Sequence, residues 1–311
     1  MRASKPTGRE AEARLRIGLY AAGGGRGHAL RATGLARALH QRDAHPVLIV
    51  PAARPLDDLD PTLPISRLPA VASRAEASRA VTEVLRAERF DGWVSDVFPN
   101  GPANELSDVS LPPAVLVGRA HREGHTSAFI AAAARYRRVL DTEPHLGWFG
   151  GPAEPLSPMV RIPQRNPDAL SLDVLIVADD AALSGFAQRL SARIGGRVGV
   201  AAEGALRVGE RCLPSHPRLL DRVAPEMLVG PAGYNLTYEA MAAGIPHLAL
   251  PRPRRFDQQG TRADAVATRV RSIHELGRHL ASPSTRPPGV PLTSFAEAAD
   301  RVIQTLSADD G

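Results

Sequence analysis

Apolar runs of strand length alternate along the chain with amphipathic stretches of helix length. A run at 15–21 is followed by a pattern at 29–40 in which apolar positions recur at helical spacing. Further elements are predicted as strands at 46–50, 92–96 and 114–118 and a helix at 74–89. Such alternation is typical of a parallel sheet covered by helices on both faces.

The alternation restarts after a proline-rich stretch. Prolines at 144, 152, 155, 158, 163 and 167 mark a connection between two units. Beyond it we predict strands at 174–178, 197–201, 227–229 and 247–250 and helices at 181–194, 236–243, 258–267 and 294–306. A length of 311 residues agrees with two domains. The predicted fold class is therefore α/β, with two domains of similar type.

The expected domain boundaries follow these breaks. They are a polar tail at 1–13, an N-terminal domain at 14–150, a linker at 151–168, a C-terminal domain at 169–292, and a C-terminal helix at 293–311 that crosses back to the first domain.

Charge and composition indicate which classes of ligand the protein binds. The chain has 38 Lys+Arg and 33 Asp+Glu, a formal charge of +5, and Lys5 is its only lysine. The arginines are spread along the whole chain and aromatic residues make up only 4%, whereas nucleic-acid binders concentrate positive charge in a stripe. We therefore expect no nucleic-acid partner. Arginine still suits an anionic ligand, because its planar fork binds phosphate with two hydrogen bonds.

Nothing in the chain predicts membrane insertion. Apolar stretches such as 128–134 are far shorter than the ~20 residues that cross a bilayer. The polar, arginine-rich start lacks the apolar segment of a secretory signal. The single Cys212 excludes an internal disulfide. We expect a cytoplasmic protein with no transmembrane segment, and peripheral contact with a membrane stays open.

A glycine-rich loop follows the first predicted strand. Gly23, Gly24, Gly25 and Gly27 allow close backbone approach, and the helix start after them offers free N–H groups to an anion. The spacing fits neither the dinucleotide fingerprint nor the P-loop, so a plain tight turn is the alternative. His28 at the helix start is a candidate general base, since the helix dipole lowers its pKa, or else a capping residue.

A second constellation lies at 230–246, where a strand ends in a glycine turn and a helix begins. Glu239 stands one turn into that helix, where a carboxylate can accept hydrogen bonds from two vicinal ribose hydroxyls. Gly244 ends the helix. An ordinary corner between a strand and a helix is an equally good interpretation.

A polar group follows the strand predicted at 247–250. Asp257, Gln258 and Gln259 suit the hydroxyls of a sugar, although a polar helix start explains them as well. Arg252 and Arg254 in the preceding loop would complement a phosphate or only solvate the loop.

The segments at 23–28 and 233–266 together resemble the GT-B glycosyltransferases, and more closely the branch that contains the peptidoglycan N-acetylglucosaminyltransferase of lipid II synthesis. This resemblance implies two Rossmann-like domains that face a central cleft, with the acceptor in the N-terminal and the donor in the C-terminal domain. It implies hexosyl transfer from a nucleotide-sugar donor, with UDP as the expected nucleotide, to a hydroxyl or amine. We expect inversion, without a metal or another cofactor.

The resemblance also implies roles for individual residues. It places Gly233 and Tyr234 near the donor phosphates, Glu239 on the ribose, Asp257, Gln258 and Gln259 on the donor sugar, and His28 at the reaction centre. Asn235 and Arg252 are also expected to bind the donor. Asp96 opens a segment at 96–101 that resembles uncharacterised predicted transferases of the same superfamily. Asp96 or His28 would take the acceptor proton, although an Asx-turn explains Asp96 equally well.

Two departures from the pattern leave other functions open. Asp179 and Asp180 stand where GT-B members have a glycine loop near the pyrophosphate, and the chain is shorter than typical members. A non-catalytic relative that binds a nucleotide or glycan is therefore one alternative. The run at 27–31 also resembles the Gly-His-x-x-Arg of hydrolases in pseudaminic acid synthesis, so hydrolysis of a nucleotide sugar is another.

Overall fold

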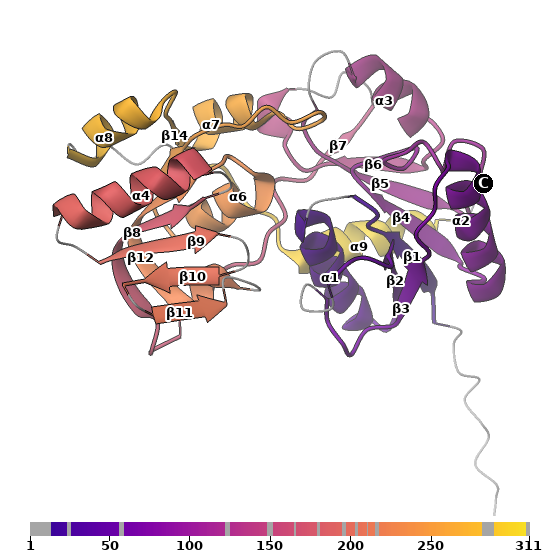
Figure 1. Ribbon diagram of the computed structural model, residues 1–311. Coiled ribbons are helices and arrows are strands. Elements are labelled where there is room, and N and C mark those ends of the chain that lie inside the picture. Colours follow the sequence, from indigo (N-terminus) through magenta and orange to yellow (C-terminus); the bar gives the residue numbers. More distant parts are fainter. Residues whose placement is uncertain are drawn as a thin grey trace, which may run out of the picture.

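The computed structural model describes most of the chain. The described residues are 14–23, 26–55, 59–121, 125–147, 152–164, 166–178, 181–194, 197–202, 205–209, 211–214, 218–281 and 289–308. The predicted tail, Gly24, Gly25, Asp179 and Asp180 lie outside them. Two sheets, each covered by helices, form two halves of the molecule (Figure 1).

The N-terminal sheet is wholly parallel in the described part of the chain, with the strand order β3-β2-β1-β4-β5-β6-β7. Its strands are β1 (Arg16–Tyr20), β2 (His45–Pro51), β3 (Ile65–Leu68), β4 (Gly92–Asp96), β5 (Ala114–Gly118), β6 (Arg138–Asp141) and β7 (Glu154–Pro155). The helices are α1 (Arg26–His40), α2 (Arg74–Glu88) and α3 (Thr126–Ala133), with a 3₁₀ turn η2 (Pro144–Leu146). The central strands are buried along their length because helices cover both faces.

The C-terminal sheet has the order β11-β10-β9-β8-β12-β13-β14. Its strands are β8 (Leu170–Val177), β9 (Val198–Ala202), β10 (Ala205–Val208), β11 (Arg211–Pro214), β12 (Val223–Gly230), β13 (His247–Ala249) and β14 (Thr268–Arg269). The helices are α4 (Ala181–Ile194), α5 (Leu219–Arg222), α6 (Tyr234–Ala242), α7 (Gln259–Val266) and α8 (Ile273–Ala281). β9, β10 and β11 pair antiparallel, and the other described pairs are parallel.

The last helix, α9 (Phe295–Leu306), returns to the first sheet and packs against α1 (Figure 1). Ser294 caps it by accepting a hydrogen bond from the backbone of Glu297. Its buried face belongs to the same apolar cluster as β1 and includes Ala298, Val302 and Leu306. The core of the N-terminal half is thus built from both ends of the described chain.

The structure confirms the predicted α/β class. It also contains elements that were not predicted, such as β3, α3, β6 and α8, and it differs from the expected bounds of others. α1 begins at Arg26, three residues before the expected start, so His28 lies in its first turn. Residues 154–155 of the expected linker pair with β6. The hairpin β10–β11 lies in a stretch for which no element was predicted. Among the described helices, none is long and apolar enough to span a membrane.

Candidate functional site

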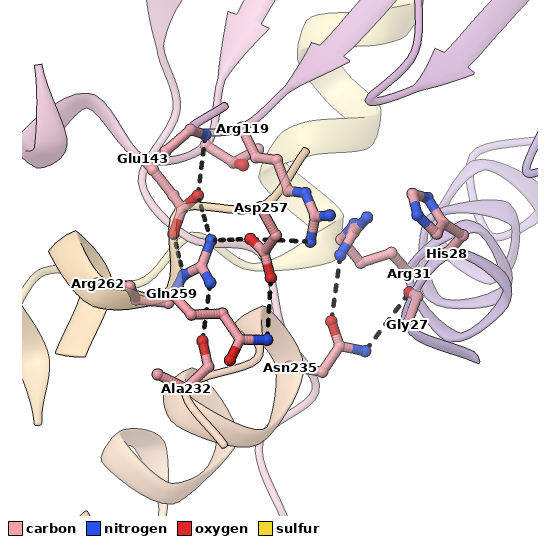
Figure 2. Close-up of polar contacts among 12 residues, drawn as sticks. Gly27, His28, Arg31, Arg119, Glu143, Ala232, Asn235, Asp257, Gln259 and Arg262 are labelled. Carbon is pink, nitrogen blue, oxygen red and sulfur yellow. Dashed lines mark hydrogen bonds and ion pairs between the residues drawn. The ribbon is translucent and has the colours of Figure 1, made fainter. Parts of the chain in front are cut away.

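The candidate site lies where the carboxyl ends of the N-terminal strands meet the C-terminal half. Asp96 is the last residue of β4, and His28 lies in the helix that follows β1, the neighbouring strand. Arg31 of α1 donates a hydrogen bond of 3.2 Å to Asn235 of α6, which joins the two halves (Figure 2). Open α/β sheets bind their ligands at such strand ends.

His28 and Asp96 form a buried pair. Nδ1 of His28 lies 2.5 Å from Oδ2 of Asp96, and each side chain is 8% exposed. Burial raises the pKa of Asp96, but the charges of Arg31 and His28 outweigh it, and this pKa lies well below its ordinary value. An ionised carboxylate can only accept a hydrogen bond, so Nδ1 carries the imidazole proton and Nε2 keeps its lone pair.

The same environment keeps His28 neutral. Burial lowers the pKa of His28, although the negative charge of Asp96 acts in the opposite direction. Arg31 holds Asp96 from the other side, with hydrogen bonds of 3.0 Å from Nε and 2.9 Å from Nη2. A neutral imidazole with a fixed tautomer and an ionised carboxylate behind it can act as a general base.

The glycine loop packs closely against the imidazole of His28. A Cβ on Gly23 would lie 2.3 Å from Cδ2 and 2.4 Å from Nε2 of His28, far inside van der Waals contact. A Cβ on Gly27 would lie 3.5 Å from Asn235, an ordinary distance. Gly23 is therefore needed for close packing against His28.

The backbone after Asp96 is strained. Val97 has a φ of 72°, in the left-handed region that β-branched residues rarely adopt. Its N–H donates to the carbonyl of Val117 at 2.9 Å, which helps to hold this conformation. Such a residue costs about 1–3 kcal/mol and is found most often at functional sites. Here the strained residue connects Asp96 to Phe98, and both of these contact His28.

Aromatic rings surround Phe98 beside His28. The ring of Phe98 lies 5.4 Å from that of His28 and 5.5 Å from that of Phe256, which belongs to the C-terminal half. The rings of Phe129 and His121, tilted by 36° with centroids 3.8 Å apart, lie next to Phe98. We call Phe98, His121, Phe129 and Phe256 the aromatic cluster. It gives the site an apolar wall built from both halves.

A second polar group joins the halves through Glu143 and Arg262. Both side chains are fully buried, and Arg262 donates from Nε at 2.5 Å and from Nη2 at 2.9 Å to the two oxygens of Glu143. Glu143 also accepts from the backbone of Ala120 and the hydroxyl of Tyr238. Burial lowers the pKa of Arg262, but the charges of Glu143 and Asp257 raise it well above its ordinary value.

Asp257 and Gln259, two of the residues expected to face a donor sugar, lie beside this pair (Figure 2). Asp257 accepts a hydrogen bond of 3.0 Å from Arg262, and Gln259 accepts one of 2.9 Å from the backbone of Arg252. Gln258 lies at the N-cap of α7 and is half-buried. Asp257 and Gln259 are thus bonded to protein groups in this structure.

The residues expected near the donor phosphates lie at the start of α6. Gly233 is its N-cap, and a Cβ there would meet nothing within 4 Å in the described part of the chain. The ring of Tyr234 lies 4.7 Å from the guanidinium carbon of Arg31 and 5.7 Å from that of Arg262. Its hydroxyl accepts from the backbone of Met159. The ring of Tyr234 therefore packs near two arginines, and its hydroxyl is bonded to the backbone of Met159.

Glu239 lies further along α6 and is half-buried. Burial raises the pKa of Glu239 to about 7. The positive charge of Arg161 opposes this shift, and the negative charge of Asp221 adds to it. Within the described residues its carboxyl has no hydrogen bond or ion pair with protein. The group is therefore available to ligand hydroxyls.

Four charged residues at this site were not among the predicted site residues. They are Arg31, Arg119, Glu143 and Arg262. A charged residue on the same helical face as Ala263 and Val266 is a weak signal for Arg262, whereas Glu143 has no comparable signal in the sequence. Among the described residues, no three His, Cys, Asp or Glu side chains are placed to hold a metal ion.

Sequence comparisons find no relative. No family model matches the chain, and no curated protein matches it.

Solved structures do match. The spinosyn rhamnosyltransferase SpnG superposes with a TM-score of 0.60 at 14% identity, over 94% of this chain and 96% of that one. CalG4, the calicheamicin glycosyltransferase, gives 0.58 at 15% identity over 94% of each chain. The glycosyltransferase SnogD from Streptomyces nogalater gives 0.55 at 15%, over 94% and 95%. SpnG has been solved with thymidine diphosphate and with spinosyn aglycone. The fold is that of the GT-B glycosyltransferases.

Proposed function

We propose that this protein is a glycosyltransferase that moves a sugar from a nucleotide-diphosphate donor to a hydroxyl or amine of an acceptor. The observation that carries the proposal is the buried pair of His28 and Asp96, placed where the two halves of a GT-B fold meet. A neutral imidazole with Nε2 unprotonated is the group that such a transfer needs to take the acceptor proton.

The proposed reaction is a single displacement. Nε2 of His28 takes the proton while the acceptor oxygen or nitrogen forms a bond to the anomeric carbon. The bond from that carbon to the diphosphate oxygen breaks, and its electron pair leaves with the diphosphate through an oxocarbenium-like transition state. Asp96 stabilises the imidazolium that forms. One displacement inverts the configuration at the anomeric carbon, and no step requires a metal.

For the donor, we propose that Glu239 binds the ribose and that Gly233 and Asn235 lie near the phosphates. Asp257, Gln258 and Gln259 would bind the sugar, which requires Asp257 and Gln259 to exchange protein partners for sugar hydroxyls. The nucleotide is UDP by the sequence resemblance, and thymidine diphosphate is the second candidate because SpnG binds it. The finer resemblance to the peptidoglycan branch stays a prediction that rests on 233–266.

For the acceptor, we propose a molecule with an apolar face. The aromatic cluster lies directly beside His28, so an apolar acceptor that packs on it would bring its hydroxyl to Nε2. SpnG, which has been solved with an aglycone, is a precedent in the same fold.

The test is product formation from UDP- and TDP-sugars with panels of apolar and sugar acceptors. Transfer with inverted configuration by NMR, lost in His28→Ala, is the expected result. A product of retained configuration would contradict the mechanism. Stoichiometric release of free sugar without an acceptor would identify a hydrolase, and nucleotide-sugar binding without turnover would identify a non-catalytic relative.

A further inference from the structure

Arg119 is a charged residue of the site that the proposed reaction has not used. It directly follows β5, the strand beside β4, and therefore lies at the same sheet edge as Asp96. Its side chain is 13% exposed and points toward Asp257, with its guanidinium near that of Arg31 (Figure 2). It contributes a positive charge between His28 and the residues expected to bind a donor sugar.

Arg119 is poorly paired compared with its neighbours. Arg31 makes two hydrogen bonds to Asp96, and Arg262 donates to three acceptors. The nearest charged partner of Arg119 is Asp257, at 3.9 Å from Nη1, beyond hydrogen-bond distance. Its Nε–H is buried and has no hydrogen-bond partner in the described part of the chain. A buried donor without an acceptor is unfavourable and calls for a physical reason.

The electrostatics agree with this geometry. Burial lowers the pKa of Arg119, and the charges of Arg31 and Arg262 lower it further, so that Asp257 compensates only in part. The pKa of Arg31 and that of Arg262 are both raised, because each has a carboxylate in direct contact. Of these three arginines, Arg119 gains most from an incoming anion.

We propose that Arg119 is a phosphate-binding residue, whose guanidinium leaves its weak contact with Asp257 and binds phosphoryl oxygens of the ligand. The planar fork and the unpaired Nε–H suit two parallel hydrogen bonds to such oxygens. Asp257 keeps its hydrogen bond from Arg262 on Oδ1, the same oxygen that Arg119 approaches. The assignment of that phosphate to the donor's diphosphate rests on the proposed function. There Arg119 offsets the charge that develops on the leaving group.

The test compares ligands with and without phosphate on matched variants. Calorimetry measures the binding of inorganic pyrophosphate, UDP, TDP, a sugar 1-phosphate, and uridine to wild type, Arg119→Gln, Arg119→Lys and Asp257→Asn. The control is Arg74→Gln, because the exposed Arg74 pairs with Asp108 on α2's side of the N-terminal half. Circular dichroism and Tm establish that each variant is folded.

We expect Arg119→Gln to weaken pyrophosphate binding about 10- to 100-fold, the loss of one or two charge-assisted hydrogen bonds. Arg119→Lys should bind with intermediate affinity, uridine binding should not change, and Asp257→Asn should bind pyrophosphate more tightly. Wild-type affinity in Arg119→Gln, or an equal loss in Arg74→Gln, would overturn the proposal. So would the absence of any phosphate binding to wild type. Should Arg119→Gln not fold, the Arg119→Lys and Asp257→Asn results decide.

The ligand series separates this inference from the proposed function. Stronger dependence on Arg119 for UDP or TDP than for the sugar 1-phosphate assigns the phosphate to the donor. The reverse order assigns it to a phosphorylated acceptor, and both results support Arg119 as the phosphate ligand. Pyrophosphate binding through Arg119 without any sugar transfer would leave this inference standing and contradict the proposed function alone.

Discussion

His28 and Asp96 are joined by a hydrogen bond of 2.5 Å that connects the first turn of α1 to the end of β4. The contact exists because β1 and β4 are neighbouring parallel strands, so that whatever follows one lies beside whatever ends the other. Sixty-eight residues separate the two side chains in sequence. The parallel register thus assembles the proposed catalytic pair.

Replacing His28 should remove the base and leave the fold intact. We expect His28→Ala to lower kcat about 10²- to 10⁴-fold with little change in donor affinity. Since burial lowers the pKa of His28 from 6.5, the wild-type kcat at saturating donor should be flat near neutral pH and should fall only below pH 6.5, when the ring is protonated. His40→Gln, at the exposed end of the same helix, is the control. A rate that falls as pH rises through 7 would exclude a neutral imidazole base.

Glu239 should distinguish ribose from deoxyribose. A carboxylate accepts from two vicinal hydroxyls in UDP but from only one hydroxyl in TDP, so Glu239→Gln should weaken UDP more than TDP. Because the pKa of Glu239 is raised to about 7, the carboxylate forms as pH rises through 7, and wild-type affinity for UDP should increase over that range. Calorimetry at several pH values measures both effects. Equal losses for the two nucleotides would place Glu239 away from the ribose.

Removing one partner of the pair between Glu143 and Arg262 should destabilise the whole protein. Glu143→Ala removes the main carboxylate partner of the fully buried Arg262 and leaves it the hydrogen bond to Asp257, and we expect the free energy of unfolding to fall by about 3–5 kcal/mol. Asp108→Asn breaks a pair whose side chains are 50% and 75% exposed, and should change stability by less than about 1 kcal/mol. Urea unfolding measures both. A similar decrease in the free energy of unfolding of the two variants would mean that the buried pair contributes no more to stability than the exposed one.

Two glycines in helices should respond oppositely to alanine. A Cβ on Gly277 of α8 meets none of the described residues within 4 Å, so Gly277→Ala should stabilise by up to about 1 kcal/mol through helix propensity. A Cβ on Gly34 of α1 would lie 2.4 Å from the ring of Phe295, and the resulting overpacking of about 1–3 kcal/mol should exceed that gain. Thermal unfolding compares the variants. An increase in the stability of Gly34→Ala would show that Phe295 and α9 can shift to make room for the methyl group at little cost.

The fold class could be predicted because its signal is local. Apolar runs and helical periodicity place β1, β4 and β5 within a residue or two of the observed bounds. The hairpin of β10 and β11 could not be predicted, because its strands are short and β10 pairs with β9 through tertiary structure that the local pattern does not report. The pattern reports which face of an element is buried, and it does not report what lies against that face.

For the same reason, only part of the candidate site could be predicted from the sequence. His28 and Asp96 could be found because each follows a strand and has chemistry of its own. Arg119, Glu143 and Arg262 acquire their roles from partners more than 100 residues away in sequence, as the separation of 119 between Glu143 and Arg262 illustrates. No local spacing encodes such a pair.

The position of α9 has a consequence for the order of events during synthesis. The sheet of the N-terminal half leaves the ribosome first, but its apolar core is incomplete without Ala298, Val302 and Leu306. Domains usually fold one after another as they emerge. We expect that here the core of the first domain is completed only after the second has been translated, and that a nascent chain stalled before residue 295 exposes the face of α1 that Phe295 covers.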